Sequence, residues 1–316
     1  MNNSCSNVYI ATKLFSFFDR EVSELMYEAV SSCQKLREAN IYLPFRDSNM
    51  KVDNTGDVAY NIFNADILAM NQTDFLLCRL DGLSYDAGVG FEIGYCFARE
   101  IPIAVFTTDF MKTKVFGRHF KVSILLESIA TVFQYEYRNI RTLTYKEELD
   151  YNICCFVDYI KNALDSGNIA SMYVQQSVNV KIDIFIDICG CKYEWSNVIA
   201  EEIKKFAESV GLICWVSRRY SVDYSIDSEF AALRSAFVFI SCYDENEPDL
   251  DSCVLQGYAY HEGKRIFGYE TNKVVYYVEG KQQMGVNLML EQSCDFIARD
   301  IDALKTCILK LNEDRK

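Results

Sequence analysis

The sequence predicts an α/β protein built from two doubly wound parallel-sheet domains, the second of which repeats the first. One observation behind this prediction is that short apolar segments alternate with longer segments whose apolar residues keep helical spacing. The other is that the same order of elements, with stretches of similar sequence, occurs twice. The length of 316 residues and a hydrophobic content of 50% provide for two such cores. We expect the domains to span residues 1–165 and 180–316 and to be related by a pseudo-twofold axis.

The first half carries the clearer pattern. Val22, Met26 and Val30 keep helical spacing, and prolines at 44 and 102 interrupt the neighbouring segments. We expect strands at 8–11, 41–43, 75–80 and 103–106, and helices at about 20–38, at 58–71, from near Glu92 to before Pro102, at 121–128 and at 145–164. Strands separated by helices in this way form a parallel sheet with helices on both faces.

The second half repeats this order. A strand at 184–187, a helix at 194–210 and a strand at 212–216 come first. Residues 229–244 then align with 66–81 without a gap, and 249–258 align with 86–95. Two copies of one α/β domain explain these similarities most simply.

The two copies differ where chemistry is expected. The second copy has Leu255 in the position of Glu92, so it presents no carboxylate there, and it has Asn287 in the position of Ser123. These differences are either drift after duplication or the sign of one working site. In the second case the first copy supplies a nucleophile and the second supplies a polar partner.

The segment from Asp86 to Tyr95 is the most informative in the chain. We expect a glycine-rich turn, with Gly88 in it, to follow the strand at 75–80 and to open a helix with Glu92 in its first turn. In that position the helix macrodipole favours an ionised carboxylate, and the glycines let a bound molecule approach the backbone. Such a carboxylate is a potential nucleophile for an anomeric carbon. The alternative is that Glu92 only begins a helix.

Composition and charge exclude several kinds of function. The formal net charge of −13 argues against nucleic acid and against an anionic membrane surface as partners. We expect no signal peptide and no membrane span, because the sequence shows no basic n-region with a cleavage site and no apolar run that approaches roughly 20 residues. We expect a cytoplasmic location, because the 13 cysteines are scattered like reduced thiols. The cysteine pairs at 154–155 and 189–191 lack metal-ligand spacing, and only two histidines exist to complete a site. We therefore expect no metal and no other cofactor.

Three parts of the first half, Val8–Phe15, Asp66 and Asp86–Gly94, resemble the nucleoside 2-deoxyribosyltransferase family. The second half resembles a degenerate member of the same family. The resemblance implies a flavodoxin-like fold, a site at a subunit interface, and a nucleoside and a free nucleobase as small-molecule partners. Further association of such pseudo-dimers into a homo-oligomer is left open.

The resemblance implies catalytic roles for three residues. Glu92 falls on the family's nucleophile, which attacks the anomeric carbon of deoxyribose. Asp66, 26 residues earlier, falls on an aspartate that contacts the base and helps to protonate it. Tyr9 falls on a tyrosine whose hydroxyl hydrogen-bonds the nucleophile.

The resemblance also implies substrate-binding roles. Gly88 lies in the segment that approaches the substrate. Asp86 would bind the sugar hydroxyls, and Phe15 would line the base pocket. Ser48 stands where some members carry a base-reading glutamine or asparagine. Asn287 falls on an asparagine that a neighbouring subunit contributes.

Three functions fit these residues. The first is retaining transfer of 2-deoxyribose between nucleobases through a covalent ester on Glu92. The second is hydrolysis of deoxynucleosides or of their 5′-monophosphates, although a carboxylate at Asp86 would repel a phosphate dianion. The third is a non-catalytic sensor that binds a nucleoside or nucleotide between the two domains.

Overall fold

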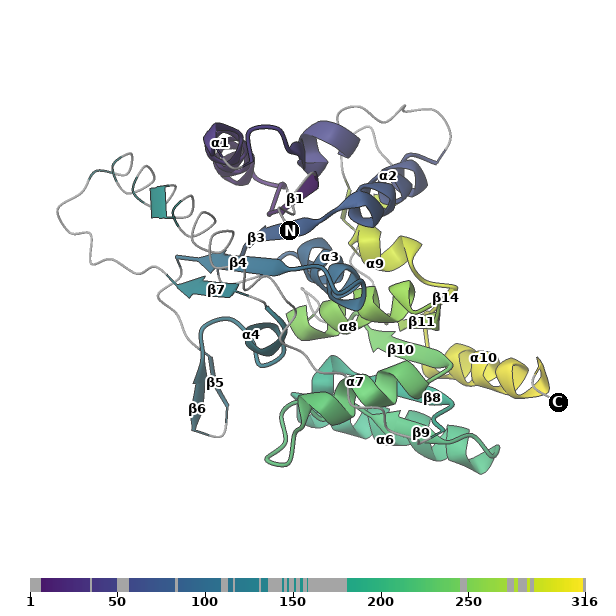
Figure 1. Cartoon of the computed structure of the whole chain (residues 1–316). Helices are drawn as coiled ribbons and strands as arrows, with labels where there is room; N and C mark the ends of the chain where they lie inside the picture. Colours follow the sequence, from purple (N-terminus) through teal and green to yellow (C-terminus); the bar gives the residue numbers. More distant parts are fainter. Residues whose placement is uncertain are drawn as a thin grey trace.

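The computed structural model describes residues 7–34, 36–49, 57–82, 85–108, 113–115, 117–130, 132–135, 144, 147, 151, 154–155, 158, 181–244, 249–271, 276–277, 283–284 and 287–314. These residues form two five-stranded parallel sheets, one in each half of the chain, covered by helices (Figure 1). The helix expected at 145–164 lies almost entirely outside the described residues, as does the expected boundary between the domains at 165–180.

The first sheet has the strand order β2-β1-β3-β4-β7, and every neighbouring pair is parallel. Counted along the chain, this is the 2-1-3-4-5 order of flavodoxin-like folds. Its strands are β1 (Asn7–Ala11), β2 (Asn40–Tyr42), β3 (Phe75–Arg79), β4 (Ile103–Thr107) and β7 (Val132–Tyr135). Its helices are α1 (Phe17–Ser32), α2 (Val58–Gln72), α3 (Ala87–Ala98) and α4 (Leu126–Ile129), with a π-helical turn at Phe45–Asn49 and a hairpin of β5 (Thr113–Val115) and β6 (Arg118–Phe120).

The second sheet has the matching order β9-β8-β10-β11-β14 and is also parallel throughout. Its strands are β8 (Ile184–Asp187), β9 (Cys214–Val216), β10 (Val238–Cys242), β11 (Arg265–Tyr269) and β14 (Phe296–Ala298). Its helices are α6 (Glu194–Ser209), α7 (Ile226–Ser235), α8 (Leu250–His261), α9 (Leu288–Gln292) and α10 (Ile301–Asp314), with a 3₁₀ turn at Cys189–Cys191 and a hairpin of β12 (Tyr276–Tyr277) and β13 (Gln283–Met284). The fold class predicted from the sequence, two flavodoxin-like parallel-sheet units, is confirmed.

Strand register relates the two sheets residue by residue. In the first sheet Tyr9 pairs with Leu76 on one side and with Tyr42 on the other. In the second sheet Phe185 pairs with Phe239 and with Trp215 in the same way. Phe185 therefore takes the place of Tyr9, and Trp215 takes the place of Tyr42.

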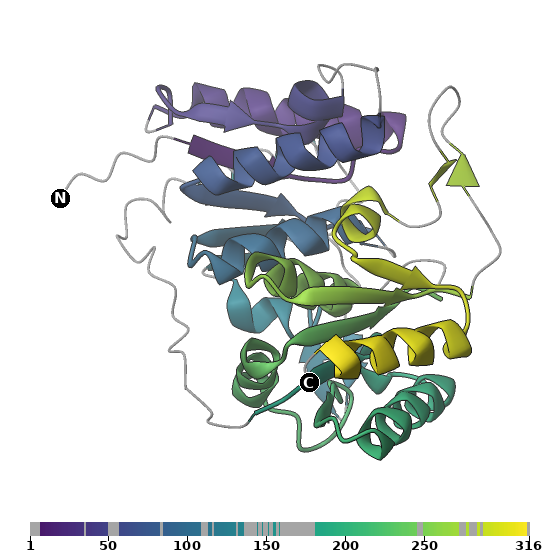
Figure 2. The same ribbon diagram turned by 90° about the vertical axis from the view of Figure 1, so that its right-hand side faces the viewer.

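Helices α3 and α8 join the two halves. They lie side by side where the upper, N-terminal half meets the lower half (Figures 1 and 2). A Cβ on Gly94 would lie 1.8 Å from the carbonyl oxygen of Val254, and a Cβ on Gly257 would lie 1.9 Å from that of Phe91. The contact is reciprocal, since Gly94 aligns with Gly257 and Phe91 with Val254. Reciprocal contacts of this kind are those of an isologous interface.

Three expected helices of the first half differ from those in the structure. Helix α1 begins at Phe17, because Ser16 caps it: the Ser16 hydroxyl accepts from the Asp19 amide, and the Asp19 carboxylate accepts from the Ser16 amide, both at 3.0 Å. It ends at Ser32 instead of 38. In place of the helix expected at 121–128, only the four residues of α4 are helical. The helix expected from near Glu92 begins earlier, as described below.

No helix in the described part of the chain is long and apolar enough to cross a membrane.

The reciprocal glycine contact leads to a stability prediction. Replacing Gly94 or Gly257 with alanine should lower the free energy of unfolding by about 3 kcal/mol, because the added methyl group meets a backbone carbonyl that cannot rotate away. Urea denaturation measures this. Gly263→Ala is the control, since Gly263 has a φ of +66° but open space around it, and its cost should be roughly 1 kcal/mol. Equal costs at all three positions would contradict the close helix contact.

Candidate active site

The candidate site lies at the point where the strand order of the first sheet reverses, next to β1 and β3. Ligands of open parallel sheets bind at the carboxyl ends of the strands beside such a switch point. Four polar side chains meet here, and each comes from a different element: Tyr9 from β1, Tyr42 from β2, Asp66 from α2 and Glu92 from α3.

Glu92 and Tyr9 form one hydrogen-bonded pair. The Tyr9 hydroxyl donates to Glu92 Oε1 at 2.6 Å. Glu92 is only 5% exposed and the Tyr9 side chain is fully buried. The tyrosine therefore fixes the carboxylate of Glu92 and supplies a donor that stabilises its ionised form.

Asp66 and Tyr42 form a second pair beside the first. The Tyr42 hydroxyl donates to Asp66 Oδ1 at 2.8 Å, and Asp66 is 4% exposed. The Tyr9 and Tyr42 rings are stacked with 5.1 Å between their centroids. Two acid–tyrosine pairs thus share one stack of aromatic rings.

Ser48 lies next to the second pair. It is fully buried in the π-helical turn and donates to the carbonyl oxygen of Pro44 at 2.8 Å. Burial raises the pKa values of both Asp66 and Tyr42, and hydrogen bonding with Ser48 opposes this rise. The structure therefore brings this predicted base-reading position to Asp66.

Asp86 is the point at which the second half reaches the site. Its Oδ1 atom accepts from the amides of Gly88 at 2.7 Å and Val89 at 3.3 Å and so caps helix α3. Asn287, from the second half, donates its Nδ2 to the same Oδ1 at 3.4 Å. The amide of Asn287 is held in turn, because its Oδ1 caps α9 by accepting from Met289 N.

The expected glycine turn before Glu92 is absent, and this part of the sequence analysis is wrong. Helix α3 begins at Ala87, so Gly88 and Gly90 lie inside it and Glu92 is its sixth residue, beyond the first turn. The glycines serve close packing instead. A Cβ on Gly90 would lie 2.7 Å from Cys253 Cβ on α8, and a Cβ on Gly88 would lie 3.3 Å from the Asn287 amide.

The electrostatics of Glu92 also differ from the expectation. Burial is the largest effect and raises the pKa of Glu92 well above its ordinary value; the negative charges of Asp66 and Asp86 raise it further, and only the Tyr9 hydrogen bond opposes them. The field of the helix N-terminus acts mainly on the first turn, so it does not offset desolvation at the sixth residue. The carboxyl group of Glu92 therefore holds its proton more strongly than predicted.

Asp66 shows the same balance in a milder form. Burial raises its pKa to about 7, while hydrogen bonds from Tyr42 and Ser48 lower it. Because the charge of Asp66 raises the pKa of Glu92, the two acids titrate as a pair, and near neutral pH the pair retains a proton. Burial likewise raises the pKa of Asp86, opposed by the amides of Gly88 and Val89.

Phe15 differs from the other predicted site residues. It lies in the loop after β1, and its side chain is 60% exposed, so it is not part of the buried cluster. Its role in lining the base pocket stays a prediction. Within the described residues, no group of three or more histidine, cysteine or acidic side chains is arranged to hold a metal ion.

Comparison with known proteins is informative for the first half. Residues 8–142 match the model of a family described as nucleoside 2-deoxyribosyltransferase. The first half of the chain is therefore similar to that family over this segment. Among solved structures, the chain is similar to a conserved protein from Enterococcus faecalis V583, with 27% identity over 35% of this chain and 68% of that chain and a TM-score of 0.31. No curated protein matches the chain.

The four polar side chains that meet at the site, together with Asp86, all fall inside the segment that matches the family model, whereas Asn287 falls outside it. The match to this family over residues 8–142 supports a nucleoside-related transfer or hydrolysis of a glycosidic bond. Tyr42 is the site residue that the sequence analysis missed. The signal that could have found it is its register, because a residue of β2 directly opposite Tyr9 must lie beside the same pocket.

The raised pKa of Asp66 predicts a pH dependence of stability. An acid that binds its proton more tightly when folded makes the folded state less stable as pH rises, here between about 4 and about 7. Asp66→Asn should remove this loss and raise the free energy of unfolding at pH 8 by up to about 4 kcal/mol, with little change at pH 4. Urea denaturation at both pH values tests this, with the exposed Asp223→Asn as control. A variant that gains nothing at pH 8 would contradict the raised pKa.

Proposed function

We propose that the protein transfers 2-deoxyribose from one nucleobase to another with retention of configuration, through a covalent ester on Glu92. The observation that supports this most directly is the buried Glu92–Tyr9 pair beside a second acid, Asp66, within the segment that matches the family model. A nucleophile and a separate proton donor are the two groups that such a reaction needs.

In the first step the base leaves and the ester forms. Asp66, whose pKa burial raises to about 7, gives a proton to a ring nitrogen of the departing base. The bond between that base and the anomeric carbon breaks, and a carboxylate oxygen of Glu92 bonds to the carbon. Tyr9 holds Oε1, so Oε2 is the oxygen that attacks. The ionised Glu92 that this step requires is the form that the Tyr9 hydroxyl stabilises.

In the second step an acceptor base takes the place of the first. Its ring nitrogen attacks the anomeric carbon from the vacated face, the ester bond breaks, and Asp66 takes up the proton that this nitrogen loses. Two inversions at one carbon give net retention. Water in the place of the acceptor would give hydrolysis, so the burial of both acids favours transfer.

The substrate is best assigned as an unphosphorylated nucleoside. Asp86 uses Oδ1 for the helix cap and for Asn287, and its Oδ2, which takes part in neither, is positioned to accept from a sugar hydroxyl. A phosphate dianion at the sugar would meet the charge of Asp86. We assign Ser48 and Phe15 to the base and Gly88 to the sugar side of the site.

The experiment that tests the reaction is chromatography of the purified protein with 2′-deoxynucleosides, with and without a second free base. Glu92→Ala should lower the rate by roughly 10³-fold or more, because it removes the carboxylate on which the proposed ester forms. A new nucleoside that appears only with the acceptor supports transfer. Free base released without an acceptor would make the protein a hydrolase. No turnover of nucleosides or monophosphates, together with binding retained in Glu92→Ala, would favour a sensor.

Tyr9→Phe tests how Glu92 is held. Without the hydroxyl, the pKa of Glu92 should rise further, so kcat should fall about 10- to 100-fold at neutral pH and the rising limb of the pH–rate profile should move to higher pH. The fold should persist, because Phe185 occupies the equivalent position in the second sheet. A lower rate with an unshifted pH profile would show that the hydroxyl does not stabilise the ionised carboxylate.

A further inference from the structure

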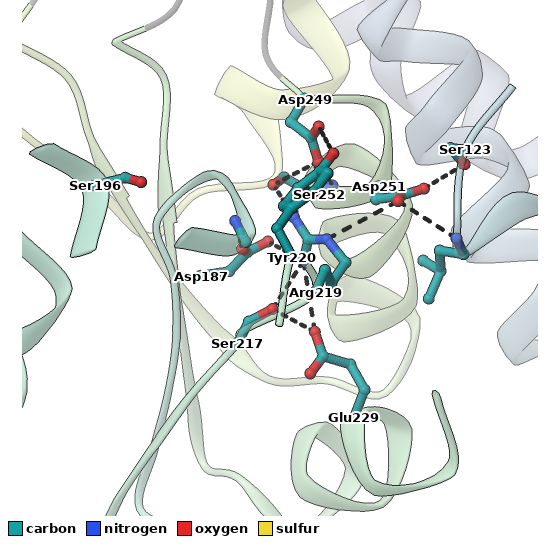
Figure 3. Close-up of polar contacts among 12 residues, drawn as sticks. Ser123, Asp187, Ser196, Ser217, Arg219, Tyr220, Glu229, Asp249, Asp251 and Ser252 are labelled. Atoms are coloured by element: carbon teal, nitrogen blue, oxygen red, sulfur yellow. Dashed lines mark hydrogen bonds and ion pairs between the residues drawn. The ribbon is translucent and has the colours of Figure 1, made fainter. Parts of the chain in front are cut away.

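The second half contains a buried arginine at the place that corresponds to the candidate site. Arg219 is fully buried and lies among four acidic side chains, Asp187, Glu229, Asp249 and Asp251 (Figure 3). A buried guanidinium is costly unless its donors are satisfied, so the surroundings of Arg219 must supply acceptors.

The guanidinium is held at both ends. Its Nη1 lies 3.1 Å from Asp187 Oδ2 and 3.5 Å from Glu229 Oε1. Its Nη2 donates to Asp249 Oδ2 at 3.0 Å and to the hydroxyl of Ser252 at 2.7 Å. A planar group with donors on both sides thus spans the distance between Glu229 and Asp249.

These two acids are the counterparts of the acids in the first half. Glu229 follows Asp66 by the same 163 residues by which Asp249 follows Asp86. Asp66 and Glu229 are each buried on the helix before the third strand of their sheet. Asp86 and Asp249 each cap the helix that follows that strand. The guanidinium therefore lies between the positions that correspond to the base-binding and sugar-binding acids.

The arginine at the same place in the first half points elsewhere. Arg219 is four residues after Trp215, and Arg46 is four residues after Tyr42, the register counterpart of Trp215. Arg46 lies 3.9 Å over the ring of Tyr27 and 3.8 Å from Glu24, at the surface. Only the second half directs this side chain inward.

From this placement we propose that Arg219 is a built-in occupant of the second half's pocket, where its guanidinium fills the space that the substrate takes in the first half. The chain then has one substrate site, because the other pocket is closed by its own side chain. The statement that a substrate takes the equivalent space in the first half rests on the proposed function. The position of Arg219 in the second half's pocket is tested without it.

The charges and the neighbouring half fit a permanently filled pocket. Burial raises the pKa values of Glu229 and Asp251 to about 7, and the charge of Arg219 lowers both, so the arginine favours the ionised form of these acids. Asp251 Oδ1 accepts from the hydroxyl of Ser123 at 2.5 Å. Ser123 of the first half thus contacts the acid cluster of the second half, just as Asn287 of the second half contacts Asp86 of the first.

The test is chemical rescue. Arg219→Ala should lower the Tm by roughly 10 °C, because the acids lose their cation. Guanidinium chloride at about 10 mM, well below denaturing concentrations, should restore several degrees in this variant and nothing in the wild type. The matched control is Arg218→Ala, since Arg218 is exposed and bonds Asn197 and Glu201 at the surface. Equimolar sodium chloride controls for ionic strength. No rescue, or equal rescue by sodium chloride, would overturn the proposal.

A second measurement uses the wild-type chain and covers the case in which Arg219→Ala does not fold. Phenylglyoxal labels accessible arginines, and peptide mass spectrometry reads the label at each position. Arg218 should be labelled and Arg219 should stay unlabelled. Labelling of Arg219 at the rate of Arg218 would show an open pocket and overturn the proposal. Neither measurement depends on turnover, so both keep their meaning if the chain proves to lack transferase activity.

Discussion

The rest of the structure depends on the close contact between α3 and α8. Gly94 and Gly257 let the two helix backbones approach to a distance that no side chain would permit. Helix α3 carries Glu92 and is capped by Asp86, so this contact also fixes where the second half lies relative to the candidate site. The contact of Asn287 with Asp86 follows from it, as does that of Ser123 with Asp251. A wider helix separation would leave both acids without their partners from the other half.

Desolvation of acidic side chains is the largest electrostatic effect in both pockets, but the two halves compensate for it with different groups. In the first half, tyrosine and serine hydroxyls hold buried acids whose pKa values are raised, and the pair keeps a proton that the proposed reaction can use. In the second half, a fixed cation supplies the compensation. Hydroxyl groups leave a carboxyl able to gain and lose a proton, whereas an arginine does not titrate at any ordinary pH.

Sequence alone predicts the strongly periodic and strand-length segments well, and the parts set by tertiary contacts poorly. The strand at 184–187 and the helix at 58–71 agree with β8 and α2 nearly residue for residue. The edge strands β7 and β14 are missed, because no element is predicted at either. Gly88 and Gly90 were interpreted as a turn because local sequence cannot distinguish a turn from a close helix contact. The pKa of Glu92 depends on burial, which no local pattern reveals.

Asn287 of the second half contacts Asp86 of the first, and Ser123 of the first half contacts Asp251 of the second, within one polypeptide. In a symmetric homodimer every substitution appears at both sites, so neither can change without the other. Here Phe185 and Leu255 stand only in the second half, while Tyr9 and Glu92 stand only in the first. Arg219 is buried among acids, whereas Arg46 at the equivalent position lies at the surface. A single chain also keeps the concentration of one half around the other constant on dilution. One polypeptide therefore permits the two pockets to differ, and it keeps the contact of Asn287 with Asp86 independent of any monomer–dimer equilibrium.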